Sequence, residues 1–321
     1  MVTMGGDETK NDKIATRQHE GVTWVDVRIP DSTTFAELEE RYHLHPIHLT
    51  ESVQKVQHTQ VEREEDYLFL ALHFPVFEPH TDKIFAGQIG VFLGKDFLIT
   101  VHAEASASLQ NLWNDSERAP EHYYAQGSAY LLYALISNLL GSIAGMTELV
   151  EGELDEIESL VFENSTSDAM RIGKLRQKIV RLKRLIGPKR TLLQDLSEEV
   201  RDFSHKDISK YYGNNVKMVD RLWEVIEEAQ ETIEIYKDAD FTTSTEKTNS
   251  ILAILTLVFT FTIPVTVVAG LYGMNVLLPG GDLAGSWMFM GRYTTFILVL
   301  VVSTLVAGGM YVYFRRNRWL R

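Results

Sequence analysis

Two long apolar segments near the C-terminal end constrain this 321-residue chain more than any other feature. No residue from Ser250 to Leu271 is charged, and a second apolar run extends from about Thr294 to Phe314. At about 1.5 Å per residue, each run is about 30 Å long as a helix, which matches the hydrocarbon core of a bilayer. We therefore predict that both runs cross a membrane.

The first apolar segment is closed by the tetrapeptide Tyr272-Gly273-Met274-Asn275. An unpaired backbone amide costs several kcal/mol inside hydrocarbon, so a non-helical turn at a membrane boundary must face protein or water. A polar collar at the mouth of a pore meets this requirement.

Charge placement predicts the topology. About 245 residues precede the apolar segments, and the polar N-terminus lacks the basic and apolar pattern of a secretory signal, so this body is expected in the cytosol. The loop between the segments carries only Asp282 and Arg292. The basic residues after the second segment are Arg315, Arg316, Arg318 and Arg321. Positive charge favours the cytoplasmic side, which predicts a multi-pass protein of the cell (inner) membrane with both termini cytoplasmic.

Composition narrows the function classes. A net charge of −13 argues against a nucleic-acid partner and suits an affinity for cations. The chain has no cysteine, which excludes disulfides and thiolate metal sites. It has no GxxxxGK[ST] loop and no spaced set of nucleophile, base and oxyanion donors, so we expect neither an ATP site nor an enzyme, and no cofactor.

Periodicity predicts an α+β cytoplasmic domain followed by a long stalk helix and two transmembrane helices. Three β-rich runs are expected at 22–29, 67–77 and 89–101, with helices at 35–42 and 47–56 between them. The predicted divisions are a disordered N-terminus (1–20), an α/β domain (21–122), a helical hairpin (123–203), a stalk helix (204–249), the pore-lining transmembrane helix (250–271), an external loop (272–293), the second transmembrane helix (294–314) and a basic tail (315–321).

Two stretches of the helical part leave alternatives open. The segment between Glu121 and Glu148 is uncharged and contains a GxxxG pattern, but its serines favour a buried soluble helix over a third crossing. After it, an acidic stretch (148–163) and a basic stretch (171–190) flank a turn at 164–167. Folding about that turn brings opposite charges together. The acids are otherwise solvated or a reservoir for divalent ions, and the bases are solvated or contact anionic lipid.

At this point the sequence resembles the CorA family of divalent-cation channels over most of its length. The signature is Tyr272-Gly273-Met274-Asn275, placed after a membrane helix and before a short loop and a final helix. Further similar segments are Leu44-His45-Pro46, Tyr130-Leu131-Leu132-Tyr133, Leu154-Asp155-Glu156-Ile157, Ile186-Gly187-Pro188, Lys247-Thr248-Asn249, Pro264-Val265-Thr266 and Tyr313 to Leu320.

The resemblance implies a homopentameric funnel whose first membrane helices line a central pore. Gly273, Met274 and Asn275 then form the selectivity filter, and Asn275 is the residue that holds the ion. The expected pore-lining residues are Asn249, Leu252, Leu255, Ile263 and Thr266. Leu252 and Leu255 are expected to form a hydrophobic constriction, and Phe259, on the same stripe, is bulky for a pore wall. The alternative is that this stripe is only a helix contact.

Two departures from the family pattern concern charge. After Asn275 many members carry Met-Pro-Glu-Leu, whereas this chain has Leu278-Pro279-Gly280-Gly281-Asp282, so Asp282 is expected to attract external cations. The family's inhibitory intracellular ion sites use aspartates, but the corresponding stalk position here is Asn214, which predicts weaker or differently placed gating by cytosolic Mg²⁺.

The chemistry of Mg²⁺ agrees with a neutral amide ring, because this ion releases its water shell reluctantly and is better held through its waters. The expected function is therefore uptake of Mg²⁺, with Co²⁺ or Ni²⁺ as further ions, down the electrochemical gradient. The expected partners are the other copies of the chain, divalent cations and lipid. The alternatives are Zn²⁺ transport of the ZntB type, Mg²⁺ efflux, and a non-conducting membrane scaffold or sensor. The closely spaced His43, His45 and His48 raise the further alternative of a zinc-responsive site.

Overall fold

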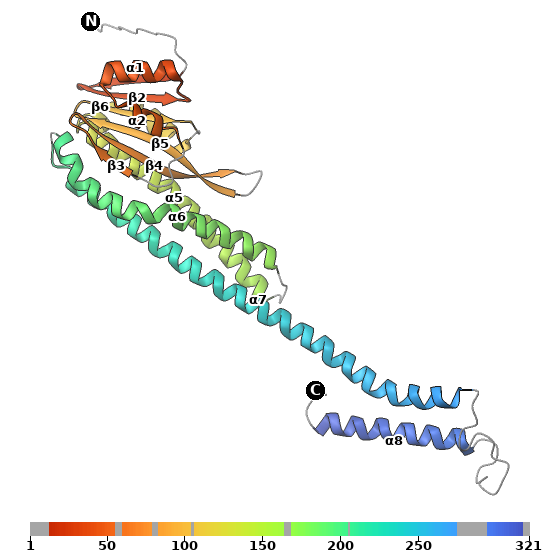
Figure 1. The fold of residues 1–321 in the computed structure, drawn as a ribbon. Helices are drawn as coiled ribbons and strands as arrows, with labels where there is room; N and C mark the ends of the chain where they lie inside the picture. Colours follow the sequence, from red (N-terminus) through yellow and green to blue (C-terminus); the bar gives the residue numbers. More distant parts are fainter. Residues whose placement is uncertain are drawn as a thin grey trace. The chain divides into compact units, whose positions relative to one another are not determined.

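The computed structural model describes residues 13–54, 60–78, 83–103, 106–163, 168–204, 206–274 and 294–316. Its contacts divide the chain into two compact units, Met1–Asp240 and Phe241–Arg321. The first contains a mixed sheet and a helical layer, and the second contains two apolar helices (Figure 1).

The sheet of the first unit has six strands in the order β1-β2-β6-β5-β4-β3. All neighbours are antiparallel except β2 and β6, which are parallel. The strands are β1 (Ile14–His19), β2 (Val22–Arg28), β3 (Gln60–Arg63), β4 (Tyr67–Glu78), β5 (Lys83–Gly94) and β6 (Phe97–His102). Alternate residues of β4 enter two separate apolar cores, Leu68 and Leu70 on one face and Tyr67 and Phe69 on the other. Burial on both faces explains why β4 reads as one continuous apolar run.

Helices cover both faces of this sheet. The smaller core contains Leu38 of α1 and Leu49 of α2, and the larger one joins the opposite face to the long helices. The helices of the N-terminal half are α1 (Ser32–Tyr42), α2 (Pro46–Glu51), α3 (Ala107–Arg118) and α4 (Pro120–Tyr124). Asp31 caps α1 by accepting a hydrogen bond from Thr34 N–H, the usual role of an aspartate at this position. The larger core runs without a break from the sheet into the helical layer.

Two elements of the sheet differ from the sequence prediction. Ile14–His19 lies within the segment predicted to be disordered, yet it forms strand β1. It pairs with β2 through a two-residue turn in which Glu20 and Gly21 both have positive φ, the geometry of a tight hairpin turn. The run predicted at 89–101 is the end of β5 and the start of β6, which turn back on each other at Lys95 and Asp96. Apolar composition alone did not reveal these two short turns.

Helices α5 (Ser128–Glu158) and α6 (Ala169–Glu199) run antiparallel. Lys178 Nζ lies 2.6 Å from Glu153 Oε1, and Arg171 pairs with Glu156, so a step forward along α6 is a step backward along α5. The predicted contact between the acidic and basic stretches is therefore confirmed, and the predicted turn at 164–167 lies outside the described residues. Short helical segments extend both helices, η1 (Ser159–Glu163) and η2 (Val200–Phe203).

Helix α5 is the segment for which a third membrane crossing was considered. Three helices of the described chain are long and apolar enough to cross a membrane, namely α5 with its extension, α7 and α8. The most apolar window of α5 is 56% buried within the protein, whereas those of α7 and α8 are 0% buried. Leu131, Leu135 and Ile143 of α5 are fully buried in the larger core. This burial agrees with a soluble core helix.

Helix α7 (Ser209–Tyr272) is a single helix that joins most of the predicted stalk helix (204–249) to the predicted transmembrane segment (250–271). Its first part packs in the first unit, where Ile226 and Ile233 are fully buried. Three acidic side chains of α7 pair with basic side chains of α6 at seven-residue intervals on both helices. These pairs are Arg176–Glu234, Lys183–Glu227 and Arg190–Asp220. Three basic side chains of α6 therefore meet α7, a contact that the hairpin prediction did not include.

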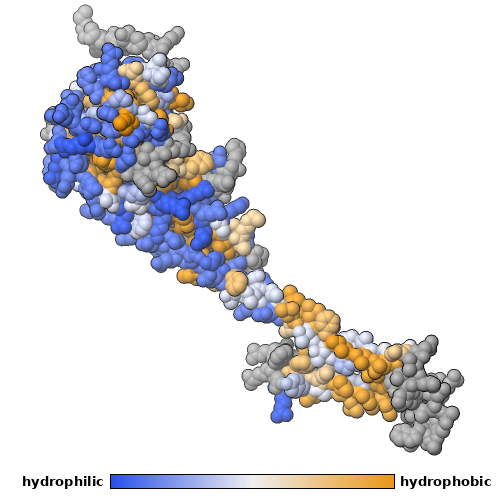
Figure 2. Space-filling model, viewed as in Figure 1, coloured by the Kyte–Doolittle hydropathy of each residue, from blue (hydrophilic) through white to orange (hydrophobic). Residues whose placement is uncertain are grey.

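The second unit consists of the end of α7 and helix α8 (Thr294–Arg316), which lie side by side and antiparallel (Figure 1). The rings of Phe261 and Phe314 are 6.2 Å apart, and Val265 and Phe296 line a shallow groove between the two helices. Hydrophobic side chains dominate the visible surface of this unit (Figure 2). Such a surface requires lipid or further protein around it.

Candidate functional site

The end of α7 presents two different faces. The partly buried residues that face α8 recur at helical spacing; they are Leu257, Thr260, Phe261, Pro264 and Val268. Leu255 lies two residues from Leu257 and Thr266 two residues from Pro264, which is about 200° around the helix, and Ile263 lies about 100° from Pro264. The predicted pore-lining stripe therefore lies mainly on the side of α7 that is turned away from α8.

Side chains of this stripe are exposed within one chain. Leu252, Leu255, Phe259 and Ile263 are 54%, 43%, 56% and 55% exposed. Asn249, at the start of the stripe, is also exposed. All five predicted pore-lining residues are thus exposed on α7 within one chain, and their role in a pore stays a prediction.

Four threonines near the end of α7 donate their hydroxyl protons to the preceding turn of the helix. Thr266 Oγ1 donates a 2.9 Å hydrogen bond to the carbonyl oxygen of Thr262, and Thr262 Oγ1 donates a 2.7 Å bond to that of Val258. Thr256 and Thr260 bond to the preceding turn in the same way. Each hydroxyl oxygen keeps free lone pairs, so Thr266 can accept a hydrogen bond from water, including water bound to a cation.

The turn that ends α7 is tight. Gly273 N–H donates a 2.9 Å bond to Ala269 O, and Met274 N–H donates a 3.3 Å bond to Leu271 O. A Cβ at position 273 would lie 3.2 Å from the carbonyl oxygen of Ala269, closer than most side chains tolerate. Glycine is therefore favoured here by space. Met274 is 56% exposed, and Asn275 and Asp282 lie outside the described residues.

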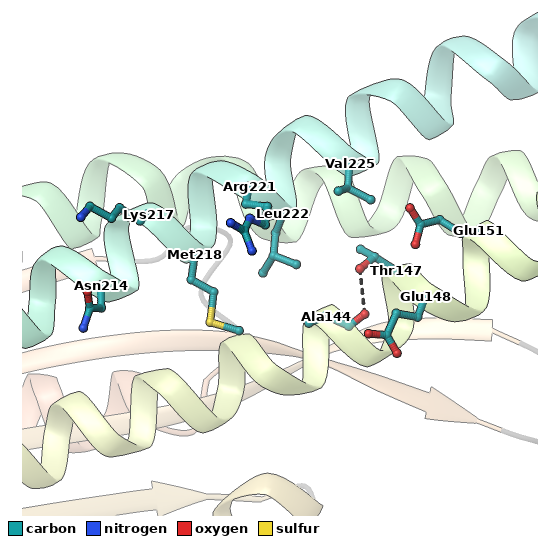
Figure 3. A pocket seen from close by; sticks show the side chains of 10 residues that line it. All are labelled: Ala144, Thr147, Glu148, Glu151, Asn214, Lys217, Met218, Arg221, Leu222 and Val225. Atoms are coloured by element: carbon teal, nitrogen blue, oxygen red, sulfur yellow. Dashed lines mark hydrogen bonds between the residues drawn. The ribbon is translucent and has the colours of Figure 1, made fainter.

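A groove in the first unit lies between α5 and α7 (Figure 3). It has a volume of about 490 Å³, and Glu148 and Glu151 line it from α5 while Lys217, Arg221 and Asn214 line it from α7. The two carboxylates are balanced by two cationic groups, so this part of the acidic stretch offers a divalent ion less attraction than its sequence suggests. Asn214 adds an amide to the lining of this groove.

The three closely spaced histidines do not form one site. His43 is exposed at the left-handed end of α1, and His45 Nδ1 accepts a 3.2 Å bond from Ile47 N–H at the start of α2. His48 is buried, and its Nε2 lies 3.0 Å from an oxygen of Glu62 on β3. Sequence spacing missed Glu62 because sheet pairing brings it to His48.

Comparisons of the sequence and of the fold with known proteins give concordant matches. The family described as CorA-like Mg²⁺ transporter protein matches residues 19–316. A cobalt/magnesium transport protein CorA from Thermotoga maritima is 24% identical over 301 residues, which cover 93% of this chain and 83% of that protein. The solved structure of the CorA magnesium transporter from Methanocaldococcus jannaschii has a TM-score of 0.78 at 20% identity, covering 93% of this chain and 92% of that one. The full-length CmaX protein gives 0.74 at 20% identity, with 93% and 89% covered.

Proposed function

Because the chain belongs to the family of CorA-like Mg²⁺ transporter proteins, we propose that it is a channel for hydrated Mg²⁺, with Co²⁺ and Ni²⁺ as further ions. One observation carries this proposal. The uncharged end of α7 keeps an open stripe opposite α8 and ends in the tight turn that leads into Asn275. The family is one of transporters and not of enzymes, and the chain is a membrane protein with two apolar helices that no soluble core covers.

The proposed assembly is a homopentamer in which five copies of α7 surround the pore. The open stripe supports this arrangement, because one chain alone leaves Leu252 and Ile263 more than half exposed. α8 packs on the opposite side of α7 and would face lipid. The proposed orientation has both termini in the cytosol, in agreement with Arg315 and Arg316 at the end of α8.

Five copies of Asn275 would ring the outer mouth. Each amide oxygen accepts hydrogen bonds from water molecules of the hydrated ion, so Mg²⁺ need not lose its shell. Five neutral amides also avoid the deep electrostatic trap that five carboxylates would form, so the ion can leave again. In this proposal Asp282 attracts cations from outside by its charge.

Below the filter, polar and apolar rings would alternate along the pore. Thr266 and Asn249 supply oxygens that accept hydrogen bonds from ion-bound water, while Leu252 and Leu255 form a constriction that closes by expelling water. The membrane potential contributes about 2.3 kcal/mol per charge per 100 mV, roughly twice that for a divalent ion, so inward flux needs no ATP.

The decisive experiment measures Mg²⁺ entry into liposomes that contain the purified protein and an internal Mg²⁺ indicator. Asn275→Ala is expected to abolish most of the flux while the oligomer keeps its mass in size-exclusion chromatography with light scattering. Thr304→Val on α8 is the matched control, since the Thr304 hydroxyl donates to the carbonyl oxygen of Leu300 in its own helix. Unchanged flux in Asn275→Ala would refute the proposed filter.

The same vesicles separate the alternatives. Flux of Zn²⁺ that follows an imposed pH gradient would indicate a ZntB-type transporter, and Mg²⁺ movement only outward from the cytosolic face would indicate efflux. A protein that forms the oligomer but conducts none of these ions at any voltage would be a scaffold or sensor. We expect Mg²⁺ flux that increases with an inside-negative potential and is independent of a pH gradient.

A further inference from the structure

A histidine and two glutamates meet at the edge of the sheet, far along the chain from the α7 turn. They are His48 and Glu51 of α2 and Glu62 of β3, and one ligand atom from each lies within 4.8 Å of the other two. We propose that these three side chains bind a first-row transition metal ion of the Zn²⁺ class. This inference is independent of the proposed channel, because no residue of α7 takes part in it.

The imidazole of His48 is held in place by its surroundings. The residue is 3% exposed, its ring stacks on Phe69 with centroids 4.7 Å apart, and its Nδ1 lies 2.8 Å from Tyr67 Oη. Only Nε2 points toward the carboxylates, 3.0 Å from Glu62 Oε2. A metal-binding histidine needs this kind of support, in which a partner at one ring nitrogen orients the other nitrogen toward the metal.

Of the two carboxylates, that of Glu51 is held in place and that of Glu62 can move. Gln60 Nε2 donates a 3.0 Å hydrogen bond to Glu51 Oε2, which holds that side chain beside the site. The side chain of Glu62 is 49% exposed and can adjust. Ligands around a tetrahedral Zn²⁺ lie about 3.3 Å apart, given metal–ligand bonds of about 2.0 to 2.2 Å. A spread of at most 4.8 Å therefore needs only small side-chain movements.

Metal binding requires a free lone pair on His48 Nε2. Tyr67 makes this possible, because its oxygen can accept a hydrogen bond from a proton on His48 Nδ1. Its oxygen already accepts a 3.0 Å bond from His45 N–H and has a second lone pair. With the imidazole proton on Nδ1, His48 donates to that lone pair, and Nε2 is free for the metal. Without metal, the proton on Nε2 would bond to Glu62 and Tyr67 O–H would donate to Nδ1. The two states differ by a tautomer and keep the same number of protons.

The donor set selects the class of metal. Imidazole suits Zn²⁺, Co²⁺ and Ni²⁺, whereas Mg²⁺ prefers oxygen ligands and keeps most of its water. One neutral imidazole and two carboxylates balance the charge of a divalent ion and leave a coordination position for water. The bound ion would link α2 to the edge strand β3, so its effect should be on the stability of this layer.

The test uses the full-length protein, purified in detergent and stripped of metal with a chelator. Zn²⁺ is titrated in the presence of excess Mg²⁺, which occupies sites that accept hydrated Mg²⁺. We expect the wild type to bind about one more Zn²⁺ per chain than His48→Gln, and Glu62→Gln to bind that ion more than about tenfold more weakly. Co²⁺ should give visible absorption in the wild type that is lost in His48→Gln.

His43→Asn is the matched control. It removes a nearby exposed histidine, and asparagine tolerates the φ of 54° at that position. The control should keep the zinc equivalent and the Co²⁺ spectrum. Zn²⁺ should also raise the thermal midpoint of the wild type and of His43→Asn, but not that of Glu62→Gln, a variant that keeps the buried imidazole and should fold.

Two results would overturn the inference. One is a wild type that binds no Zn²⁺ beyond the amount bound by His48→Gln. The other is equal loss of Zn²⁺ in His43→Asn, which would show that exposed histidines bind the metal. Either result would leave the bond between His48 and Glu62 as a purely structural contact between α2 and β3.

Discussion

Lys189 Nζ donates a 2.6 Å hydrogen bond to the backbone carbonyl oxygen of Leu185, one turn earlier in α6. The lysine is 5% exposed, and the side chains around it are Leu72, Ile136, Leu139, Leu140, Leu192 and Leu193. Burial among these apolar groups lowers the pKa of Lys189 to about 7. The larger core thus contains an amine that is half charged near neutral pH.

Replacing this lysine should stabilise the protein. In Lys189→Met the apolar side chain fills similar space without a buried amine, and we expect the free energy of unfolding at pH 7 to rise by at least about 1 kcal/mol. Thermal or urea unfolding of the full-length protein in detergent would measure the change. Lys174→Met, an exposed lysine on the same helix, should change it little. A less stable Lys189→Met would show that the bond to Leu185 outweighs the burial cost.

The same lysine predicts a pH dependence. Between pH 7 and about 10.5 the unfolded chain binds a proton at Lys189 that the folded chain lacks, so wild-type stability should rise with pH in this window. The stability difference between Lys189→Met and the wild type should therefore shrink from pH 7 to pH 10. A difference that does not vary with pH would mean that Lys189 keeps its ordinary pKa in the folded protein.

The ion pairs between α6 and α7 should modestly stabilise the alignment of the two helices along each other. Lys183 Nζ lies 3.1 Å from Glu227 Oε1 and 5.0 Å from the ring of Trp223, which Arg190 also approaches. Lys183→Glu places two like charges together, and the double variant with Glu227→Lys should recover part of the loss. We expect a coupling energy of about 0.3 to 1 kcal/mol in a double-mutant cycle, smaller at high salt. Additive effects of the two substitutions would exclude the coupling.

The turn at the end of α7 should tolerate no side chain. Gly273→Ala places a Cβ 3.2 Å from Ala269 O, so the turn must shift and Mg²⁺ flux should fall several-fold. Gly308→Ala on α8 is the matched control, because a Cβ there meets nothing within 4 Å in one chain, and alanine favours helix by about 1 kcal/mol. Equal flux in the two variants would show that the turn can relax.

A buried aspartate should contribute to the stability of the sheet. Burial raises the pKa of Asp26, but hydrogen bonds and charge from His102, with bonds from Thr100 and Arg28, outweigh it and hold that pKa below its usual value of 3.8. A lowered folded pKa gives stability that is present above pH 4 and is lost as pH falls below it. Asp26→Asn should cost about 1 to 3 kcal/mol at pH 7 and less at pH 3, measured by denaturant unfolding. A cost that does not fall at low pH would indicate lost packing instead of lost charge.

Much of the fold could be predicted because long segments carry strong periodic signals. The uncharged run from Ser250 indicated the apolar part of α7, and uninterrupted helical spacing extended that helix back into the soluble unit. Short elements were harder to predict. Strand β1 depends on a hairpin turn at Glu20 and Gly21, and its polar residues carry little apolar signal of their own.

For the candidate site, the sequence by itself determined which residues share one face of α7, because a helix fixes the angle between successive side chains. It also determined that the second unit must lie in an apolar surrounding. Only the tertiary structure decided that α8 packs on the opposite face, that three bases of α6 pair with α7, and that Glu62 reaches His48. These relations join residues far apart in the chain, and their contact depends on strand pairing and helix packing, which local sequence patterns do not encode.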